Sequence, residues 1–295
     1  MRIGAKLVFG AHDFFQTKPT IRLIATDLDG TLLLPDGTVS TRTLAVLQQI
    51  QEAGIMVVLV SARPPRVLQQ IAHMLGISGL AICCNGALVY DLDAYNIVQH
   101  WPLSSHLARR LVITLRDALP DLSFACERGL EFVCEPNFYR FFPLKAKMTM
   151  YIEDALSFCS QPLSKLIVLH SGSAVDKLQQ YVESLLGEEV IVTHSGAAFL
   201  EISAAGVTKA RTLAALCQER GITSDEVVAF GDMPNDLSML QWAGRGVAVA
   251  NAHPQVLAHA NEITLSNVED GVALVLEKIL ATNQALWALQ RVQRV

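Results

Sequence analysis

The feature that most constrains the fold of this chain is a repeated alternation of short, wholly apolar runs with longer amphipathic segments that have the spacing of helices. Strands buried on both faces read as continuous apolar sequence, and strands that alternate with helices are typical of a parallel sheet with crossover helices. The sequence therefore predicts an α/β fold around a parallel sheet. Its predicted strands are residues 23–25, 55–60, 80–84, 227–230 and 247–249.

The middle of the chain interrupts this alternation. Predicted helices at 103–119 and 174–186 accompany strand-like runs with a different spacing, and much of the aromatic content lies here, including the run from Phe138 to Phe142. Such an insert is expected to form a separate α+β domain, in which the aromatic run packs internally or against the core. The predicted organisation is an N-terminal extension (1–20), a first half of the core domain (21–102), the inserted domain (103–203) and a second half of the core (204–295).

Composition and charge argue against several classes of protein. Apolar residues make up 51% of the 295 residues and charged residues 17%, which is typical of a globular chain. A net charge of -5 without a basic run argues against nucleic acid as a partner. No apolar stretch approaches the roughly 18 residues that span a bilayer, and residues 1–20 lack the long apolar segment of a signal peptide.

The six cysteines have no CxxC or metal-ligand spacing, so we expect reduced thiols in a cytoplasmic protein. We expect a monomer or a homodimer.

Polar side chains follow four of the predicted core strands at the point where each strand ends. The carboxyl ends of parallel strands meet at one edge of the sheet, where open α/β sheets bind their ligands. These side chains are therefore expected to form one site. They are Asp27 and Asp29 after the first strand, Ser61 after the second, Asn85 after the third, and Asp232, Asn235 and Asp236 after the fourth.

Two of these features also have a simpler interpretation. Asp27, Asp29 and Gly30 favour turns for conformational reasons alone, so they are also consistent with an acidic turn. Lys209 is expected in the first turn of a helix, where a cation opposes the positive end of the helix dipole. It is either an ordinary exposed lysine or the residue that neutralises these carboxylates and holds an anionic substrate.

Four motifs, taken in order, resemble those of the haloacid dehalogenase superfamily of phosphatases and phosphotransferases. They are Asp27-Leu-Asp29-Gly-Thr, the hydroxyl at Ser61, Lys209, and Gly231-Asp232-x-x-Asn235-Asp236. The position of the insert, after Asn85-Gly-Ala and before Lys209, resembles the Cof-like branch with a large α/β cap (type IIB). The resemblance covers nearly all of the chain from Ile21 onward and implies a three-layer Rossmann-like core with an inserted α+β cap domain. The chain departs from the family at Ser61-Ala62-Arg63, where Thr-Gly-Arg is usual; the methyl of Ala62 can crowd the backbone near a phosphate.

The resemblance implies a Mg²⁺-dependent phosphatase that acts on small phosphate monoesters, such as sugar phosphates or related metabolites. Asp27 is implied as the nucleophile that forms an aspartyl-phosphate. Asp29 is implied as the general acid and base, which requires burial and neighbouring anions to raise its pKa; otherwise it only caps the turn. The implied Mg²⁺ ligands are the carboxylates of Asp27 and Asp232 and the backbone carbonyl of Asp29.

The phosphate contacts implied by the resemblance come from backbone and side chains together. They are the N–H groups of Leu28 and Ala62, Ser61 Oγ, the Lys209 ammonium and the Asn235 amide. Asp236 is expected to orient Lys209 by an ion pair, and Arg63 and Asn85 to meet the cap or the substrate. Glu127 and Arg128, at a predicted hairpin tip, are either specificity contacts or, as we favour, part of a solvated turn.

Two other functions are compatible with the same motifs. A phosphotransferase or phosphosugar mutase would pass the phosphoryl group to a sugar hydroxyl instead of water. A non-enzymatic sensor would only bind a phosphorylated metabolite, but such a protein has no need for Asp29.

Overall fold

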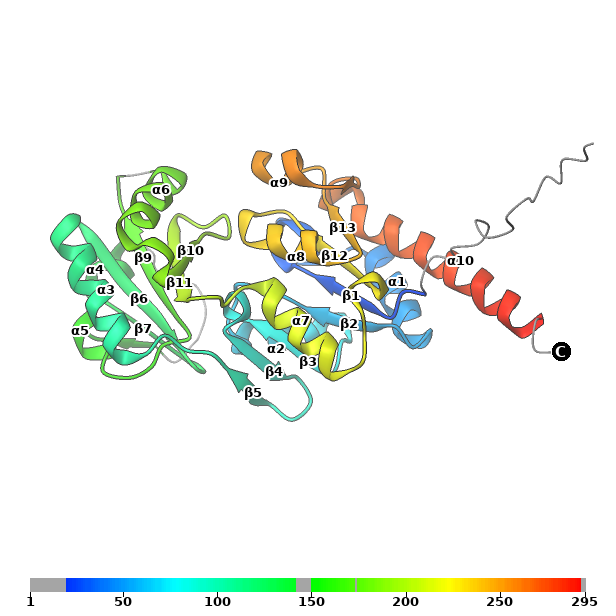
Figure 1. Ribbon diagram of the computed structural model, residues 1–295, viewed down its shortest axis with the longest axis horizontal. Coiled ribbons are helices and arrows are strands. Elements are labelled where there is room, and N and C mark those ends of the chain that lie inside the picture. The colour runs from blue at the N-terminus through cyan, green and yellow to red at the C-terminus, as the bar shows by residue number, and fades with distance from the viewer. Residues whose placement is uncertain (1–19, 142–149, 173, 293–295) are drawn as a thin grey trace, which may run out of the picture.

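The computed structural model describes residues 20–141, 150–172 and 174–292 (Figure 1). A five-stranded parallel sheet forms the centre of the core, in the order β14-β13-β12-β1-β2. A parallel bridge between Val60 and Ile82 adds β3 beside β2. The strands are β1 (Leu23–Thr26), β2 (Met56–Leu59), β3 (Leu80–Cys83), β12 (Val227–Gly231), β13 (Arg245–Ala248) and β14 (Glu262–Ile263).

Helices cover both sides of this sheet. α1 (Thr41–Glu52) packs against α10 (Gly271–Val292), and α7 (Lys209–Glu219) packs against α8 (Leu237–Trp242). These two pairs lie on opposite sides of the sheet (Figure 1). β1 and β12 are buried along their whole length between these layers, which is why their sequences are apolar without alternation. α2 (Pro65–Leu75) and α9 (Pro254–His259) complete the crossovers, and the predicted α/β core with a parallel sheet is confirmed.

Three strands of the core are absent from the sequence prediction, one of which is the two-residue strand β14. β4 (Leu88–Asp91) and β5 (Asn96–His100) pair antiparallel with β3 and with each other in a three-stranded sheet. Each residue of β5 is exposed or half-buried, so this edge strand lacks the continuous apolar run by which the other strands are recognised. β5 leads the chain out of the core towards the second unit (Figure 1).

The second unit, from α3 to β11, is built on a mixed six-stranded sheet in the order β10-β11-β9-β6-β7-β8, and we call it the cap. Helices on one face share with it a hydrophobic core separate from that of the parallel sheet. The strands are β6 (Leu122–Arg128), β7 (Glu131–Cys134), β8 (Met150–Ile152), β9 (Lys165–His170), β10 (Val190–Thr193) and β11 (Phe199–Ala204). The helices on that face are α3 (Ser105–Ala118), α5 (Ala155–Phe158) and α6 (Val175–Leu186).

The inserted α+β unit expected from the sequence is thus confirmed, whereas its limits at residues 103 and 203 stay a prediction. In the short helix α4 (Pro136–Phe141), Phe138 is buried in a small apolar cluster, which agrees with a packing role for the aromatic run. Phe142 and residues 1–19 of the predicted extension lie outside the described residues.

Candidate active site

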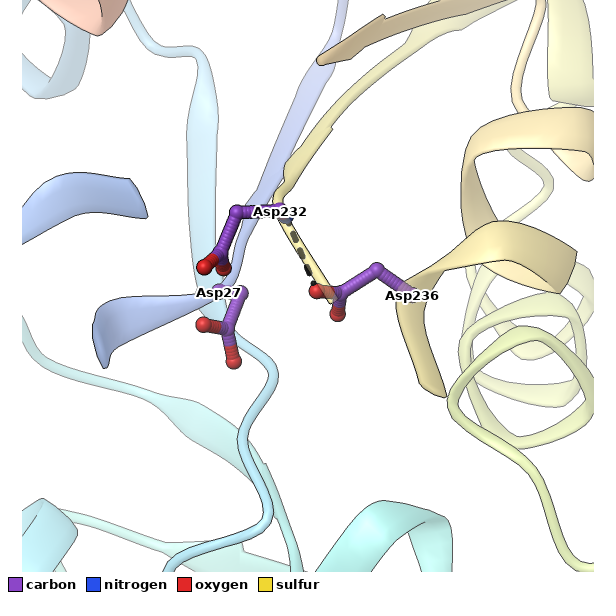
Figure 2. A group of neighbouring side chains, drawn as sticks. All are labelled: Asp27, Asp232 and Asp236. Atoms are coloured by element: carbon purple, nitrogen blue, oxygen red, sulfur yellow. Dashed lines mark hydrogen bonds between the residues drawn. The ribbon is translucent and has the colours of Figure 1, made fainter. Parts of the chain in front are cut away.

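Two acidic residues leave neighbouring strands of the parallel sheet at the same edge. β1 and β12 pair in a register that places Thr26 opposite Phe230, so Asp27 and Asp232 follow their strands side by side. Carboxylate oxygens of Asp27, Asp232 and Asp236 lie within 4.8 Å of one another, and all three residues are buried (Figure 2). The structure therefore brings together the acidic residues that the sequence places after the first and fourth core strands.

Lys209 provides a positive charge inside this group. It is the first residue of α7, and its side chain is only 1% exposed. Its Nζ donates to Asp27 Oδ1 and to Asp236 Oδ1, each at 2.6 Å. Burial by itself lowers the pKa of Lys209, but the charges of Asp236 and Asp27 outweigh this effect and the pKa is raised. The interpretation of Lys209 as an ordinary exposed lysine is wrong.

Asp236 is fixed by hydrogen bonds to both of its carboxylate oxygens. Its Oδ1 accepts from Lys209, and its Oδ2 accepts from the backbone N–H groups of Asp232 (3.1 Å) and Met233 (3.0 Å). These contacts orient Lys209 and the loop that carries Asp232. Asp236 is therefore close to the other two carboxylates but is the least available of the three to bind a ligand.

The buried charges of this group do not balance. Asp27, Asp232 and Asp236 can carry three negative charges, and Lys209 supplies one positive charge. Burial, reinforced by Asp236, raises the pKa of Asp232 to about 7. Burial also raises the pKa of Asp27 well above its usual value, against the lowering effect of Lys209. A bound divalent cation would compensate the two excess negative charges.

The donor set fits Mg²⁺, which prefers oxygen ligands and usually keeps several waters. Thr31 Oγ1 donates to Asp232 Oδ1 at 2.7 Å, which orients the carboxylate and leaves Oδ2 for a ligand. Gly30 has a φ of 75°, and a Cβ there would lie 2.4 Å from Asp232 Oδ2. Glycine thus keeps the space beside this oxygen open. Asp232 and Asp27 therefore offer carboxylate oxygens suited to this ion.

Asp29 lies in a different environment from the one that the sequence predicts. Its side chain is 45% exposed, so the expected burial is wrong. Both of its oxygens accept from Arg63, at 2.5 Å from Nε and 2.5 Å from Nη2. Asp29 and Gly30 have non-helical backbone angles in this turn. Arg63 meets Asp29 in this structure.

The residues expected to hold a phosphate surround the same edge. Ser61 and Asn85 are buried at the ends of β2 and β3, and the Asn85 N–H donates to the Ser61 carbonyl at 3.1 Å. Asn235 Nδ2 donates to Asn85 Oδ1 at 3.0 Å. Asn235 Oδ1 is buried and has no hydrogen-bond partner among the described residues. Ala62 has a negative φ, so its methyl group adds no backbone strain at this position.

The backbone of Leu28 lies at this edge as well, directly after Asp27. The Leu28 side chain is fully buried in the core, so only its peptide groups can take part in a site. Its position is compatible with the phosphate contact that the resemblance implies.

The cap contributes charged residues to this edge that the sequence reasoning missed. Lys165 and Glu201 form a buried ion pair, and Glu201 Oε2 accepts from Asn85 Nδ2 at 3.2 Å. Glu127 is 3% exposed and accepts from both terminal nitrogens of Arg66, at 2.7 and 2.9 Å, so a solvated turn is wrong for this residue. Arg128, 16% exposed in its side chain, pairs with Glu131. For Glu201, the signal available in the sequence was a lone charge inside an apolar strand, Phe199-Leu-Glu201-Ile.

A cavity of ≈ 290 Å³ lies between the cap and the core beside this edge. Ser203 lines it, and the Ser203 hydroxyl is buried without a hydrogen-bond partner among the described residues. Such an orphaned polar atom is typical of a surface that binds a ligand or water. The cavity lining includes Asn85, Lys209 and Asn235 from the core and Gln179, Thr193 and Ser203 from the cap.

Comparison with known proteins agrees with this architecture. The family model of haloacid dehalogenase-like hydrolases matches residues 24–276. The chain belongs to this family. Among solved structures, a haloacid dehalogenase-like hydrolase from Bacteroides thetaiotaomicron is similar with a TM-score of 0.73 and 32% identity, covering 88% of this chain and 99% of that one.

Two relatives within the haloacid dehalogenase-like family are named phosphatases. One is the pyridoxal phosphate phosphatase YbhA of Escherichia coli, 30% identical over 265 residues, which are 86% of this chain and 97% of the relative. The other is the 5-amino-6-(5-phospho-D-ribitylamino)uracil phosphatase YcsE of Bacillus subtilis, 27% identical over 254 residues, which are 86% and 93% of the two chains. The predicted enzyme class, a phosphatase among the hydrolases, is confirmed. Within residues 20–141, 150–172 and 174–292, no helix is both long and apolar enough to cross a membrane.

Proposed function

We propose that this chain is a Mg²⁺-dependent phosphatase that hydrolyses small phosphate monoesters through an aspartyl-phosphate intermediate. The observation that carries the proposal is the buried group of Asp27, Asp232, Asp236 and Lys209, which places three carboxyl groups and one ammonium at the carboxyl edge of the sheet. This arrangement combines an oriented carboxylate with oxygen ligands for a divalent cation. Both are needed for attack on a phosphate, which is itself an anion.

Asp27 is the proposed nucleophile. Lys209 holds Asp27 Oδ1 at 2.6 Å, so the carboxylate has a fixed orientation and its other oxygen can attack phosphorus. The attack forms a bond between this oxygen and phosphorus and breaks the bond between phosphorus and the alcohol oxygen. Water then attacks the aspartyl-phosphate, which releases inorganic phosphate and restores the carboxylate.

Positive charge at this place has two proposed sources. Asp27, Asp232 and the Asp29 carbonyl would hold Mg²⁺, which when bound supplies charge that offsets the repulsion between the carboxylate and the phosphoryl oxygens. Lys209 contributes a second charge, which persists because Asp236 and Asp27 raise its pKa. Ser61 Oγ, the N–H groups of Leu28 and Ala62 and the Asn235 amide are the proposed hydrogen-bond donors to the phosphoryl group.

Asp29 is the proposed acid that protonates the leaving alcohol and the base that then activates water. Its pairing with Arg63 must rearrange for this role. The two side chains are 45% and 39% exposed, and exposed ion pairs typically contribute about 0–1 kcal/mol, with bidentate pairs such as this one among the stronger. Exchange of Arg63 from Asp29 to a substrate is therefore energetically accessible.

The proposed substrates are small phosphorylated metabolites with a polar alcohol part. The cavity beside Lys209 has polar lining residues and an orphaned Ser203 hydroxyl, which suits a hydroxyl-bearing group. The two relatives act, by their names, on pyridoxal phosphate and on a phosphorylated ribitylaminouracil. Both compounds belong in a substrate panel beside sugar phosphates.

The proposal is tested by measuring phosphate release from p-nitrophenyl phosphate and from this panel, with Mg²⁺ and with EDTA. We expect hydrolysis that depends on Mg²⁺ and that falls below about 10⁻³ of the wild-type rate in Asp27→Asn. Asp117→Asn, on an exposed position of α3, is the matched control and should keep wild-type activity. Full activity of Asp27→Asn would refute the assigned nucleophile. Equal amounts of free phosphate and free alcohol identify hydrolysis, whereas a shortfall of free phosphate identifies transfer to another hydroxyl.

A further inference from the structure

A buried ion pair of the cap reaches the phosphate-binding edge of the core. Lys165 begins β9 and Glu201 lies in the adjacent strand β11. Their side chains are only 5% and 1% exposed, and Lys165 Nζ donates to Glu201 Oε1. Burial alone lowers the pKa of Lys165, but Glu201 and its other anionic neighbours outweigh this effect and the pKa is raised. The lysine is therefore a buried cation with a buried partner.

Each member of this pair also makes one hydrogen bond to the core. Lys165 Nζ donates to the backbone carbonyl of Ala62 at 2.8 Å. Glu201 Oε2 accepts from Asn85 Nδ2 at 3.2 Å, and Asn85 Oδ1 in turn accepts from Asn235 Nδ2 at 3.0 Å. All three core residues belong to the proposed phosphate site.

The contact with Ala62 completes a pattern along three consecutive peptide groups. The Ser61 carbonyl accepts from the Asn85 N–H, and the Arg63 carbonyl accepts from the Cys84 N–H, each at 3.1 Å. The Ala62 carbonyl between them accepts from Lys165. In a trans peptide the N–H points opposite to the carbonyl, so fixing the Ser61 and Ala62 carbonyls also fixes the directions of the N–H groups of Ala62 and Arg63.

The ordering of this loop has consequences on both sides of Ala62. The Arg63 N–H is within 3.2 Å of Ser61 Oγ, so the Ala62–Arg63 peptide positions the hydroxyl proposed to bind phosphate. Arg63 carries the guanidinium that meets Asp29. A rotation of this one peptide would therefore displace a hydroxyl, an N–H donor and a cation together.

We propose that Lys165 and Glu201 are positioning residues for catalysis: the cap uses this buried pair to orient the Ser61–Arg63 loop and the Asn85–Asn235 amides that receive the phosphoryl group. The proposal rests on the proposed phosphatase function. It assigns the cap a part in phosphate binding in addition to any part in choosing the alcohol.

The experiment compares variants of the full-length protein with saturating Mg²⁺. Lys165→Met removes the cation, and Lys165→Met/Glu201→Met removes both charges, so that no unpaired buried charge remains to destabilise the fold. Arg66→Met is the matched control, because it breaks an ion pair between the core and Glu127 of the cap, and among the described residues neither side chain has a hydrogen bond to the Ser61–Arg63 loop. Steady-state hydrolysis of p-nitrophenyl phosphate, competitive inhibition by inorganic phosphate and the thermal midpoint are measured for each.

We expect a roughly 10- to 100-fold loss of kcat/KM in both Lys165 variants, with weaker inhibition by inorganic phosphate, because small displacements of positioned groups have effects of this size. The double variant should recover thermal stability relative to Lys165→Met but not activity, and Lys165→Arg should regain part of the phosphate affinity. Arg66→Met should lower stability without changing inhibition by phosphate.

Two outcomes overturn the proposal. Wild-type inhibition by phosphate in the double variant would show that the pair has only a structural role, while the proposed function stands. A wild-type protein that neither hydrolyses phosphate esters nor binds inorganic phosphate would overturn the proposed function and the positioning role together. If Lys165→Met does not fold, the double variant, in which no unpaired buried charge remains, gives the same comparison.

Discussion

Replacing Lys209 by methionine tests the charge balance on which the site depends. The substitution keeps the length of the apolar stem but leaves Asp27 and Asp236 without the ammonium that lies 2.6 Å from each of them. With an effective dielectric constant of about 20, each contact at this distance corresponds to about 6 kcal/mol of attraction. The ammonium no longer has to be desolvated, and this offsets several kcal/mol of the loss.

The net effect expected for Lys209→Met is a destabilisation of about 3–5 kcal/mol, the range found when one partner of a buried pair is removed. The effect should be larger at pH 8 than at pH 5.5. At the lower pH, Asp27 can take up a proton, since burial already raises its pKa, and the unpaired negative charge is then removed.

Urea unfolding followed by circular dichroism, in EDTA at both pH values, measures this difference. Lys177→Met, an exposed lysine of α6, is the matched control and should unfold like the wild type. Loss of the buried cation should also reduce kcat by about 10²- to 10³-fold, as for removal of a single charge-stabilising group. An unchanged unfolding midpoint at pH 8 would refute the argument that Lys209 balances buried carboxylates.

Two further predictions concern the metal site. Gly30→Ala should abolish the stabilisation by Mg²⁺, measured as a shift of the thermal midpoint, because the new Cβ would lie 2.4 Å from Asp232 Oδ2. The control is Gly37→Ala, at a similar φ of 82°. Its Cβ would have no atom within 4 Å, so this variant should show only the cost of backbone strain. The midpoint increase on adding Mg²⁺ should be larger at pH 8 than at pH 5.5. The pKa of Asp232, about 7 against a usual 3.8, means that the metal-free folded protein binds an extra proton between these values and loses stability as the pH rises through them. Mg²⁺ replaces that proton, so an equal shift at both pH values, or an equal shift in Asp232→Asn, would contradict the assignment.

The parallel core was predictable because its signals are local. Each strand buried on both faces has an apolar run, and four of the predicted runs end at polar residues on the same edge, so Asp27 and Asp232 could be assigned to one site although about two hundred residues separate them. β5 escaped prediction because an exposed edge strand has no apolar run. The family resemblance then supplied roles that the pattern alone left open.

The sequence by itself determined which residues follow the core strands and that an α+β unit interrupts the core. Only the tertiary structure decided which charges meet. Asp29 was expected to be buried but lies half-exposed against Arg63, which belongs to a different segment of the chain. Lys165 and Glu201 gave no motif, since their partners are a backbone carbonyl and an amide of a different domain. The environment of a charge depends on contacts between segments far apart in the chain, and burial and pairing of this kind leave no periodic pattern in the sequence.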